Sequence, residues 1–465
     1  MTDEMRFESD STGSVAIPAG RYWGAQTQRA FVVFGGAPEK LPPSLIHAMG
    51  LQKCAAARAN LRLGVIEPDL AVAIEKAATE VWQGRFDGDF PLPVWQTGSG
   101  TQTNMNANEV IANRANQLLG QPLGTRKPIH PNDHVNRSQS SNDSFPTVMH
   151  VAAAQTLAQR LHPALQALRT AFAGRALAFA GVVKIGRTHL MDAVPMTVDQ
   201  AFDAFARQIG HAEARLTATL PRLHSLAQGG TAVGTGLNAP AGFDAAFCEE
   251  LSALSGLAFA PNPSKFEGMG AHDALVEVSG ALNVLAVSLI KIANDLRFLG
   301  SGPRCGLGEL QVPDDGLTSS IMPGKRNPTA AEAVLQAAFQ VVGNHACITM
   351  AGAAGSFELN VAKPVIIYDL LQSIELMAHA ATLFAAFVAG IEIDRDRLGR
   401  NVEMAIMPAT VLNPVLGYDQ VARITRKAMA EGTTPREAAI ALGLLSGEAY
   451  DQYVQPATMA QPSKS

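Results

Sequence analysis

Charged residues are scarce in this sequence. Lys, Arg, Asp and Glu make up 17% of its 465 residues, against about 25% in ordinary soluble domains. Little charge for this length predicts that part of the surface is buried between subunits. The apolar content of 47% excludes an intrinsically disordered chain. The net charge of −5 makes nucleic acid an improbable partner.

Cysteine is also scarce: Cys54, Cys248, Cys305 and Cys347 are the four present. Their spacing favours neither a zinc site nor a disulfide framework, so we expect buried free thiols in a reducing compartment. The segment Met1–Ser14 is mostly polar and acidic, unlike a secretory or mitochondrial leader. No uninterrupted apolar run reaches the roughly 18 residues of a membrane span. We therefore predict a cytoplasmic protein with no membrane partner.

Helical periodicity dominates what is present, whereas strand-type alternation is hard to find. The strongest pattern runs over His272–Leu299, where apolar residues recur every three or four positions as in a heptad seam. The seam consists of Leu275, Val278, Leu282, Leu285, Leu289, Ile292, Leu296 and Leu299. Flanking residues such as Val284 and Val287 are apolar too, so we expect this helix at the centre of a large oligomeric bundle.

Further long helices are predicted at Phe145–Ala180, Val198–Leu220, Thr329–Ala351 and Pro364–Ala389. Pro146 and Pro364 are placed at helix starts, and Pro163 is expected to kink or split the first helix. Thr434–Glu437 predicts a capped start for a shorter helix, and Gln461–Ser465 a disordered tail. We predict an all-α chain of three domains: an N-terminal domain 1–138, a central bundle 139–395 and a small C-terminal domain 396–465.

Two polar segments interrupt the first third of the chain. Thr97–Asn106 offers uncharged hydroxyls and amides that suit a small polar ligand, but they equally suit the cap of a helix beginning near Asn104. His130–Asp143 is polar throughout apart from Pro131 and Val135. We favour a functional role for it, although its last residues also suit a helix cap.

Two further segments carry reactive side chains. Gly186–His189 contains an imidazole, whose ordinary pKa near neutrality suits acid–base work, although a lone histidine is more often structural. Thr318–Pro328 combines hydroxyls, a glycine and a lysine in one loop, while Asn327 and Glu332 also suit the cap of the next helix. Gly229–Gly236 lacks the features of a phosphate-binding loop or dinucleotide fingerprint, so we predict a tight turn without cofactor. The sequence has no metal-ligand spacing.

Together and in this order, these segments resemble the fumarase/aspartase superfamily, from about Phe7 to about Val454. The superfamily-type motifs are Gly98–Gln102, Gly186–His189 and Ser319–Pro328. Within the superfamily, the sequence is most similar to class II fumarate hydratases. That pattern is followed at His130–Asp133, Ser140–Asp143 and Phe357–Val361.

The resemblance implies an all-α, three-domain subunit whose central bundle assembles into a homotetramer with a twenty-helix core. Each active site would take residues from three subunits. The implied activity is that of a hydro-lyase of the tricarboxylic acid cycle, which interconverts fumarate and L-malate through an aci-carboxylate intermediate. The substrate is a small dicarboxylate, and no metal or organic cofactor is implied.

The resemblance also assigns roles to residues. Ser319 is the base, His189 protonates the departing hydroxyl through a bound water, and Glu332 orients that imidazole. The substrate-binding residues are Ser99, Gly100, Thr101, Ser140, Ser141, Asn142, Thr188, Ser320, Lys325 and Asn327. A second anion site is assigned to Lys127, His130, Pro131, Asn132 and Asp133.

Two alternatives stay open at this point. An aspartate ammonia-lyase uses the same carbanion chemistry, but such enzymes usually carry Ser-Thr-Asn at Ser140–Asn142 and alanine at Gly324. A non-catalytic structural relative would have no need of Ser319, His189 or Lys325, which are all present. One position departs from the family pattern: Thr318 stands where glycine is usual. Because threonine resists positive φ, we expect slower or altered closure of this loop if it requires that conformation.

Overall fold

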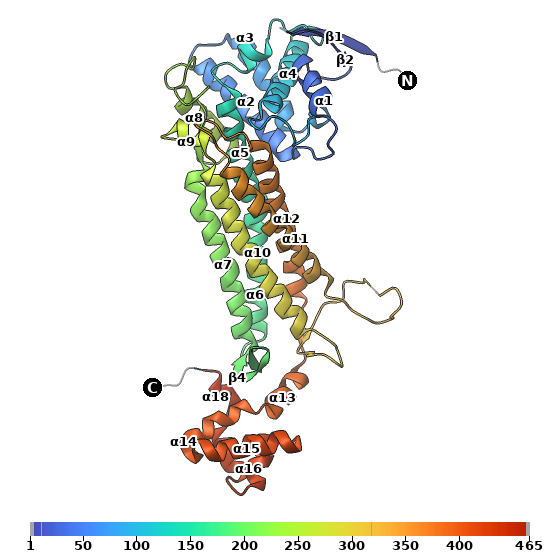
Figure 1. The fold of residues 1–465 in the computed structure, drawn as a ribbon, viewed down its shortest axis with the longest axis vertical. Coiled ribbons are helices and arrows are strands. Elements are labelled where there is room, and N and C mark those ends of the chain that lie inside the picture. Colours follow the sequence, from blue (N-terminus) through green and yellow to red (C-terminus); the bar gives the residue numbers. More distant parts are fainter. Residues whose placement is uncertain (1–3, 11, 318, 462–465) are drawn as a thin grey trace. The chain divides into compact units, whose positions relative to one another are not determined.

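The computed structural model describes residues 4–10, 12–317 and 319–461, most of them in helices (Figure 1). The chain divides into two compact units, each built from separate stretches of sequence. The first unit comprises 1–163, 212–286 and 338–378, and the second comprises 164–211, 287–337 and 379–465. Several of these divisions fall inside long helices. The predicted three-domain division at 138/139 and 395/396 therefore stays a prediction.

The first unit is organised around two buried helices, α2 and α4. Helix α2 packs against α3, α5 and α8, and α4 packs against α1, α3 and α5. The helices are α1 (Ala25–Phe34), α2 (Pro43–Arg62), α3 (Pro68–Trp82), α4 (Thr101–Leu118), α5 (Ser141–Thr156), α8 (Phe243–Ser255) and α9 (Lys265–Gly270). Short elements complete it: β1 (Met5–Asp10) antiparallel to β2 (Gly13–Pro18), β5 (Ser225–Leu226) parallel to β6 (Ala260–Pro261), η1 (Asp87–Asp89) and η2 (Pro131–Val135).

Four long helices contribute residues to both units, and all four were predicted from periodicity to within three residues at each end. They are α7 (Val198–Leu223), α10 (Asp273–Leu299), α11 (Thr329–Gly352) and α12 (Lys363–Ala389). The α10 seam is confirmed, because its members from Leu275 to Leu296 are fully buried. By length and composition alone, α10 and α12 could cross a membrane, but half or more of each apolar window is buried within the chain. Such burial is typical of core helices.

The second unit combines α6 (His162–Ala178) with small C-terminal helices. Phe172 of α6 packs edge-on against Phe205 and Phe384. Two ribbons belong to this unit: β3 (Val183–Thr188) with β4 (Met191–Thr197), and β7 (Leu310–Gln311) with β8 (Glu392–Ile393), both antiparallel. The remaining helices are α13 (Arg395–Met404), η4 (Met407–Leu412), α14 (Asn413–Leu416), α15 (Tyr418–Glu431), α16 (Pro435–Ala441), α17 (Gly447–Tyr453) and α18 (Pro456–Met459).

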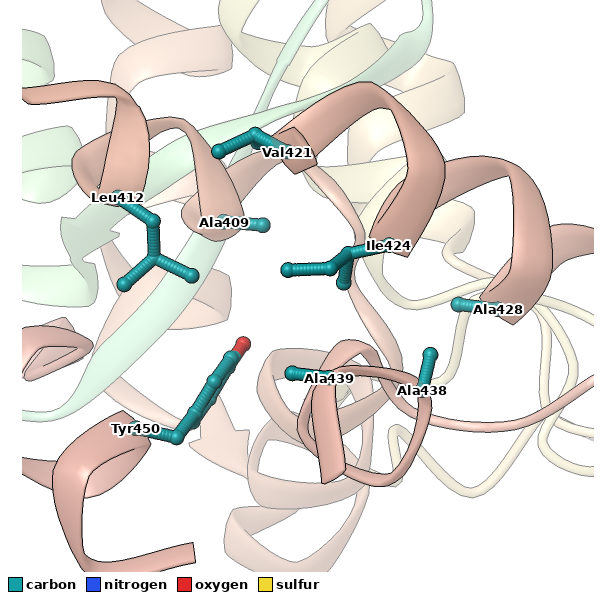
Figure 2. Packing of buried hydrophobic residues seen from close by; sticks show 8 residues of the cluster. All are labelled: Ala409, Leu412, Val421, Ile424, Ala428, Ala438, Ala439 and Tyr450. Carbon is teal, nitrogen blue, oxygen red and sulfur yellow. The ribbon is translucent and has the colours of Figure 1, made fainter. Parts of the chain in front are cut away.

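The C-terminal helices enclose a small apolar core of their own, shown in Figure 2. Ile424 of α15 is fully buried and points toward Leu412 and Ala439, while Tyr450 of α17 closes the cluster from the other side. Thr434 caps α16 in a capping box with Glu437, which confirms the predicted helix start.

Several local predictions were wrong in detail. Helix α4 begins at Thr101 rather than near Asn104, and Pro146 lies inside α5, because that helix already begins at Ser141. Ahead of Pro163, which cannot donate to the preceding turn, the predicted break takes the form of a π-helical turn, η3 (Leu157–Leu161). Cys305 is exposed rather than buried. Thr318 and tail residues 462–465 lie outside the described residues.

Candidate active site

Hydroxyl groups from two sequence segments meet in the first unit. The Thr101 Oγ1 atom lies 2.8 Å from Ser99 Oγ and 2.8 Å from Ser141 Oγ. Thr101 and Ser141 are the first residues of α4 and α5. The N–H groups and the positive dipole ends of two helices therefore converge on one half-buried hydroxyl cluster, an arrangement that favours a carboxylate.

Asp143 joins the α5 side of this cluster to the glycine-rich segment. Its Oδ1 atom accepts the Ser140 N–H at 2.9 Å, and its Oδ2 atom accepts the N–H groups of Gly229 and Thr231 at 3.0 and 2.9 Å. Asn142 Nδ2 donates to the Ala232 carbonyl at 2.9 Å. The glycine-rich stretch is thus a turn, as predicted, and its function is to hold the Ser140–Asn142 segment in place.

A buried lysine lies near this carboxylate. Lys53 is 1% exposed, and its Nζ atom donates to Asn136 Oδ1 at 3.2 Å and to Gln139 Oε1 at 2.9 Å. Burial lowers the pKa of Lys53 to about 7, an effect that the charge of Asp143 opposes, and burial raises the pKa of Asp143 to about 6. Lys53 was not singled out from the sequence, because an isolated lysine carries no pattern that indicates burial. Asp143 was considered only as part of the Ser140–Asp143 motif and as a possible helix cap.

Replacing Lys53 by methionine is expected to change how stability depends on pH. The pKa of Lys53 is lower in the folded chain than in the unfolded one, so between about pH 7 and 10 the unfolded chain binds more protons and stability rises with pH. Lys53→Met removes this contribution. Urea midpoints from pH 7 to 9 should therefore rise less steeply for the variant, with exposed Lys76→Met as control. Equal slopes for Lys53→Met and wild type would contradict the prediction.

The predicted acid lies at the tip of the β3–β4 hairpin in the second unit. Thr188 pairs with Met191, so His189 and Leu190 form a two-residue turn, with φ of 55° and 65° respectively. Two positive φ values are the pattern of a type I′ turn, which ordinarily takes Asn and Gly. Thr188, His189 and Leu190 are all exposed in the single chain. A histidine in a conformation that it disfavours indicates a functional requirement at this position.

The predicted base, Ser319, lies in a largely exposed loop, of which 312–317 and 319–328 are described, and the two ends of this loop are tied together. Asp314 pairs with Arg326 at 3.0 Å, and Asp315 accepts a hydrogen bond from Thr329. Within the loop, Ser319 Oγ accepts the N–H groups of Ile321 at 3.4 Å and Met322 at 3.1 Å. Two N–H dipoles therefore point at the oxygen on which a base would carry negative charge.

The other predicted residues of this loop are less constrained. Ser320 and Lys325 are exposed and Asn327 is half-buried. Helix α11 begins at Thr329, and within the described residues the ion pair of Glu332 is with Arg297, at 3.8 Å, rather than with His189. Among the described residues of one chain, His189 and Glu332, which were predicted to act together as the acid, therefore form no ion pair with each other.

The residues of the predicted second anion site lie together in the first unit. Lys127, His130 and Asp133 line one open cavity with Arg126 and His134. His130 Nδ1 accepts the N–H groups of Asn132 and Asp133 at 3.2 and 3.3 Å, so it caps the η2 turn in which Pro131 is buried. Burial and the charge of Arg126 lower the pKa of His130, so the imidazole is neutral near pH 7. Its 3.3 Å contact with the Asp133 carboxylate is then no ion pair.

Two functional features escaped the sequence reasoning. One is the set of hydrogen bonds by which Asp143 joins Ser140 to Gly229 and Thr231. The other is Glu309, a fully buried carboxylate that contacts Arg187 of the hairpin. In the sequence, Glu309 stands between Gly308 and Leu310, and this was the only sign that its carboxylate could be buried. Among the described residues, no group of three or more His, Cys, Asp or Glu side chains is placed to hold a metal ion.

Comparison with known proteins defines the family. A family model described as lyase matches residues 13–343, and one described as fumarase C C-terminus matches residues 409–461. The chain is 53% identical to a class II fumarate hydratase of Pseudomonas putida, with 98% of this chain and 99% of the relative aligned. It is 53% identical to the mitochondrial fumarate hydratase of Rhizopus oryzae, over 98% of this chain and 93% of the relative.

Comparison with solved structures gives the same family. A class II fumarase of Schistosoma mansoni superposes with a TM-score of 0.96 at 40% identity, and a fumarate lyase:delta crystallin of Brucella melitensis superposes with 0.94 at 42%. Both comparisons cover 99% of this chain and all of the other. The all-α fold prediction is confirmed. The chain belongs to the lyase family that these models define. Within that family its similarity is to class II fumarate hydratases, which confirms the resemblance drawn from the motifs.

Proposed function

We propose that the protein catalyses the reversible hydration of fumarate to L-malate in the tricarboxylic acid cycle. The observation that carries the proposal is the environment of Ser319, whose Oγ atom accepts two backbone N–H groups in a chain about half identical to fumarate hydratases. A serine hydroxyl is a poor base unless its alkoxide is stabilised. The two N–H dipoles, with Lys325 of the same loop, supply that stabilisation.

In the dehydration direction, Ser319 removes a proton from the methylene carbon of malate, which lies between the hydroxyl-bearing carbon and a carboxylate. The electron pair moves into that carboxylate and forms an aci-carboxylate with two negative charges. Preorganised donors around this group therefore carry most of the catalysis. We assign this role to Lys325 and Asn327. As the C–O bond breaks, the His189 imidazolium gives a proton to a bound water, and that water passes a proton to the departing hydroxyl, which leaves as water. Glu332 orients the imidazole.

The remaining polar residues hold the substrate. The hydroxyl cluster of Ser99, Thr101 and Ser141 lies at two helix N-termini, which suits one carboxylate. We assign Gly100, Ser140, Asn142, Thr188 and Ser320 to the same substrate shell. The cavity at Lys127 and His130 to Asp133 is proposed as a second anion site, supported by its two basic side chains, Arg126 and Lys127.

We propose that four copies assemble around a twenty-helix core and that each active site takes residues from three subunits. In the single chain, apolar residues on the long helices stay exposed: Val287 of α10 is 55% exposed, Phe339 of α11 56% and Met350 of α11 69%. Such surface is costly in water and favours burial against other copies. Pairing of His189 with Glu332 from another subunit then completes the acid. We further propose a cytoplasmic location and the three-domain division given above.

Turnover assays test the function directly. Fumarate absorbs in the ultraviolet, so we expect absorbance to rise when purified protein receives L-malate and to stay constant with L-aspartate. A rise with aspartate alone would make the protein an ammonia-lyase. No rise with either substrate, from a folded tetramer, would contradict the proposal and favour a non-catalytic relative.

A further inference from the structure

Glu309 is a buried carboxylate at which three parts of the second unit meet. Its side chain is 1% exposed, and Oε1 accepts hydrogen bonds from the Arg187 guanidinium and from Asn401 Nδ2, the latter at 3.0 Å. Lys184 Nζ lies 3.7 Å from Oε2. An unpaired charge at this depth is strongly unfavourable, so the two cations and the amide are needed to keep the carboxylate in place.

Both cations belong to the hairpin that carries His189. Lys184 and Arg187 lie on β3, and the pairing register with β4 shifts between Ile185 and Arg187. Arg187 precedes His189 by two residues, and it is half-buried whereas the tip is exposed. The contact with Glu309 therefore anchors the hairpin immediately below its catalytic tip.

The backbone of Glu309 is fixed from two other directions. Its N–H donates to the Leu299 carbonyl at the end of α10 at 2.9 Å, and its own carbonyl accepts the N–H of Asp394, the N-cap of α13, at 3.0 Å. The next residues form β7, which leads directly into the loop of Ser319. Glu309 thus marks the fixed point from which that loop departs.

We propose that Glu309 is a positioning residue, which holds the His189 hairpin at a set place relative to the root of the Ser319 loop. The inference rests on the proposed function and adds to it a residue that touches no substrate and acts through Arg187. The hairpin has strands of six and seven residues. Lys184 lies near the start of β3 and Arg187 next to the tip, so Glu309 holds the hairpin at both points. Loss of these contacts lets the tip shift, and a displacement of about 1 Å can lower a rate by on the order of 10²-fold.

The decisive variant is Glu309→Gln, which keeps the shape and removes the charge. We expect kcat for malate dehydration to fall about 10- to 100-fold, because the placement of the acid is lost. KM should rise by less than about threefold, because Thr188 is the one residue of the hairpin assigned to substrate binding and the other assigned residues stay in place. Amides of 183–197 should also exchange hydrogen for deuterium faster. Glu309→Asp, which restores the charge, should recover part of kcat, and it serves if the glutamine variant fails to fold.

Arg397→Met is the matched control. Arg397 donates to the carbonyls of Leu307 at 2.9 Å and Gly306 at 2.8 Å, so it stiffens the same connection. Among the described residues, the hydrogen bonds of its side chain go to 304–307 and not to the hairpin. We expect it to lower stability and leave kcat and hairpin exchange unchanged.

The outcomes separate the inference from the function on which it rests. If wild type turns over malate and Glu309→Gln retains both kcat and hairpin protection, the positioning role is wrong while the hydratase stands. Equal losses of kcat in Glu309→Gln and Arg397→Met would also overturn it, since general stiffness would then be responsible. If wild type is inactive, the proposed function fails, and hairpin exchange still decides whether Glu309 anchors the hairpin.

Discussion

Replacing Ser319 by alanine lowers kcat for malate dehydration by about 10³-fold and leaves the fold unchanged. The expected size follows from removing the group that accepts the proton, since positioned proton transfer contributes about 10²- to 10⁴-fold. Stability should hardly change, because Ser319 lies in the loop 312–328 and its hydroxyl only accepts two backbone N–H groups. Steady-state kinetics and a urea midpoint measure the two effects separately.

Isotope exchange makes this test specific for the base. Wild type should exchange a hydrogen on the methylene carbon of malate with solvent deuterium, and Ser319→Ala should not. Ser320→Ala is the matched comparison in the same loop, and it should raise KM more than it lowers kcat, because it is assigned to carboxylate binding. Near-normal turnover by Ser319→Ala would show that another group is the base.

Replacing Gly100 by alanine is expected to destabilise the folded chain by about 2 to 5 kcal/mol. Gly100 has φ of +77°, which costs an L-residue about 1–2 kcal/mol. An added Cβ would also lie 2.3 Å from Cγ of the fully buried Phe145 ring, and overpacking of this kind adds about 1–3 kcal/mol. Because Ser99 and Thr101 flank the site, substrate binding should weaken as well. Urea unfolding measures the first effect and KM the second.

Gly120→Ala provides the matched control for Gly100→Ala. Gly120 has nearly the same φ, +79°, but an added Cβ there meets no atom within 4 Å. It should therefore lose only the backbone cost of about 1–2 kcal/mol. If both variants lost the same stability, the backbone conformation alone would matter and the contact with Phe145 would not.

The long helices could be predicted from sequence because their stability comes from a repeated apolar stripe that is visible in every heptad. The α10 seam is the clearest case. The β3–β4 hairpin escaped because its thirteen strand residues show no regular alternation. The predicted starts of α4 and α5 were too late in the sequence, because Thr101 and Ser141 are both side chains of the site and the first residues of these helices.

The site was predictable only in part, for a related physical reason. The motifs containing Ser319, His189 and Thr101 are local in sequence, so their residues could be named. Glu309 and Arg187 are separated by 122 residues, and their contact exists only in the folded chain. Nothing about either residue alone indicates it. The same holds for Asp143, whose partners Gly229 and Thr231 lie more than eighty residues away.

The turn at His189 sets a limit on how this protein can evolve. Positive φ at residues 189 and 190 favours Asn or Gly, so selection for stability alone would replace the histidine. Selection for turnover would retain it. The hairpin tip is therefore a position of stability–activity trade-off, where a more thermostable variant such as His189→Asn would be a poorer enzyme. Libraries screened only for heat resistance should accumulate inactive members at this residue.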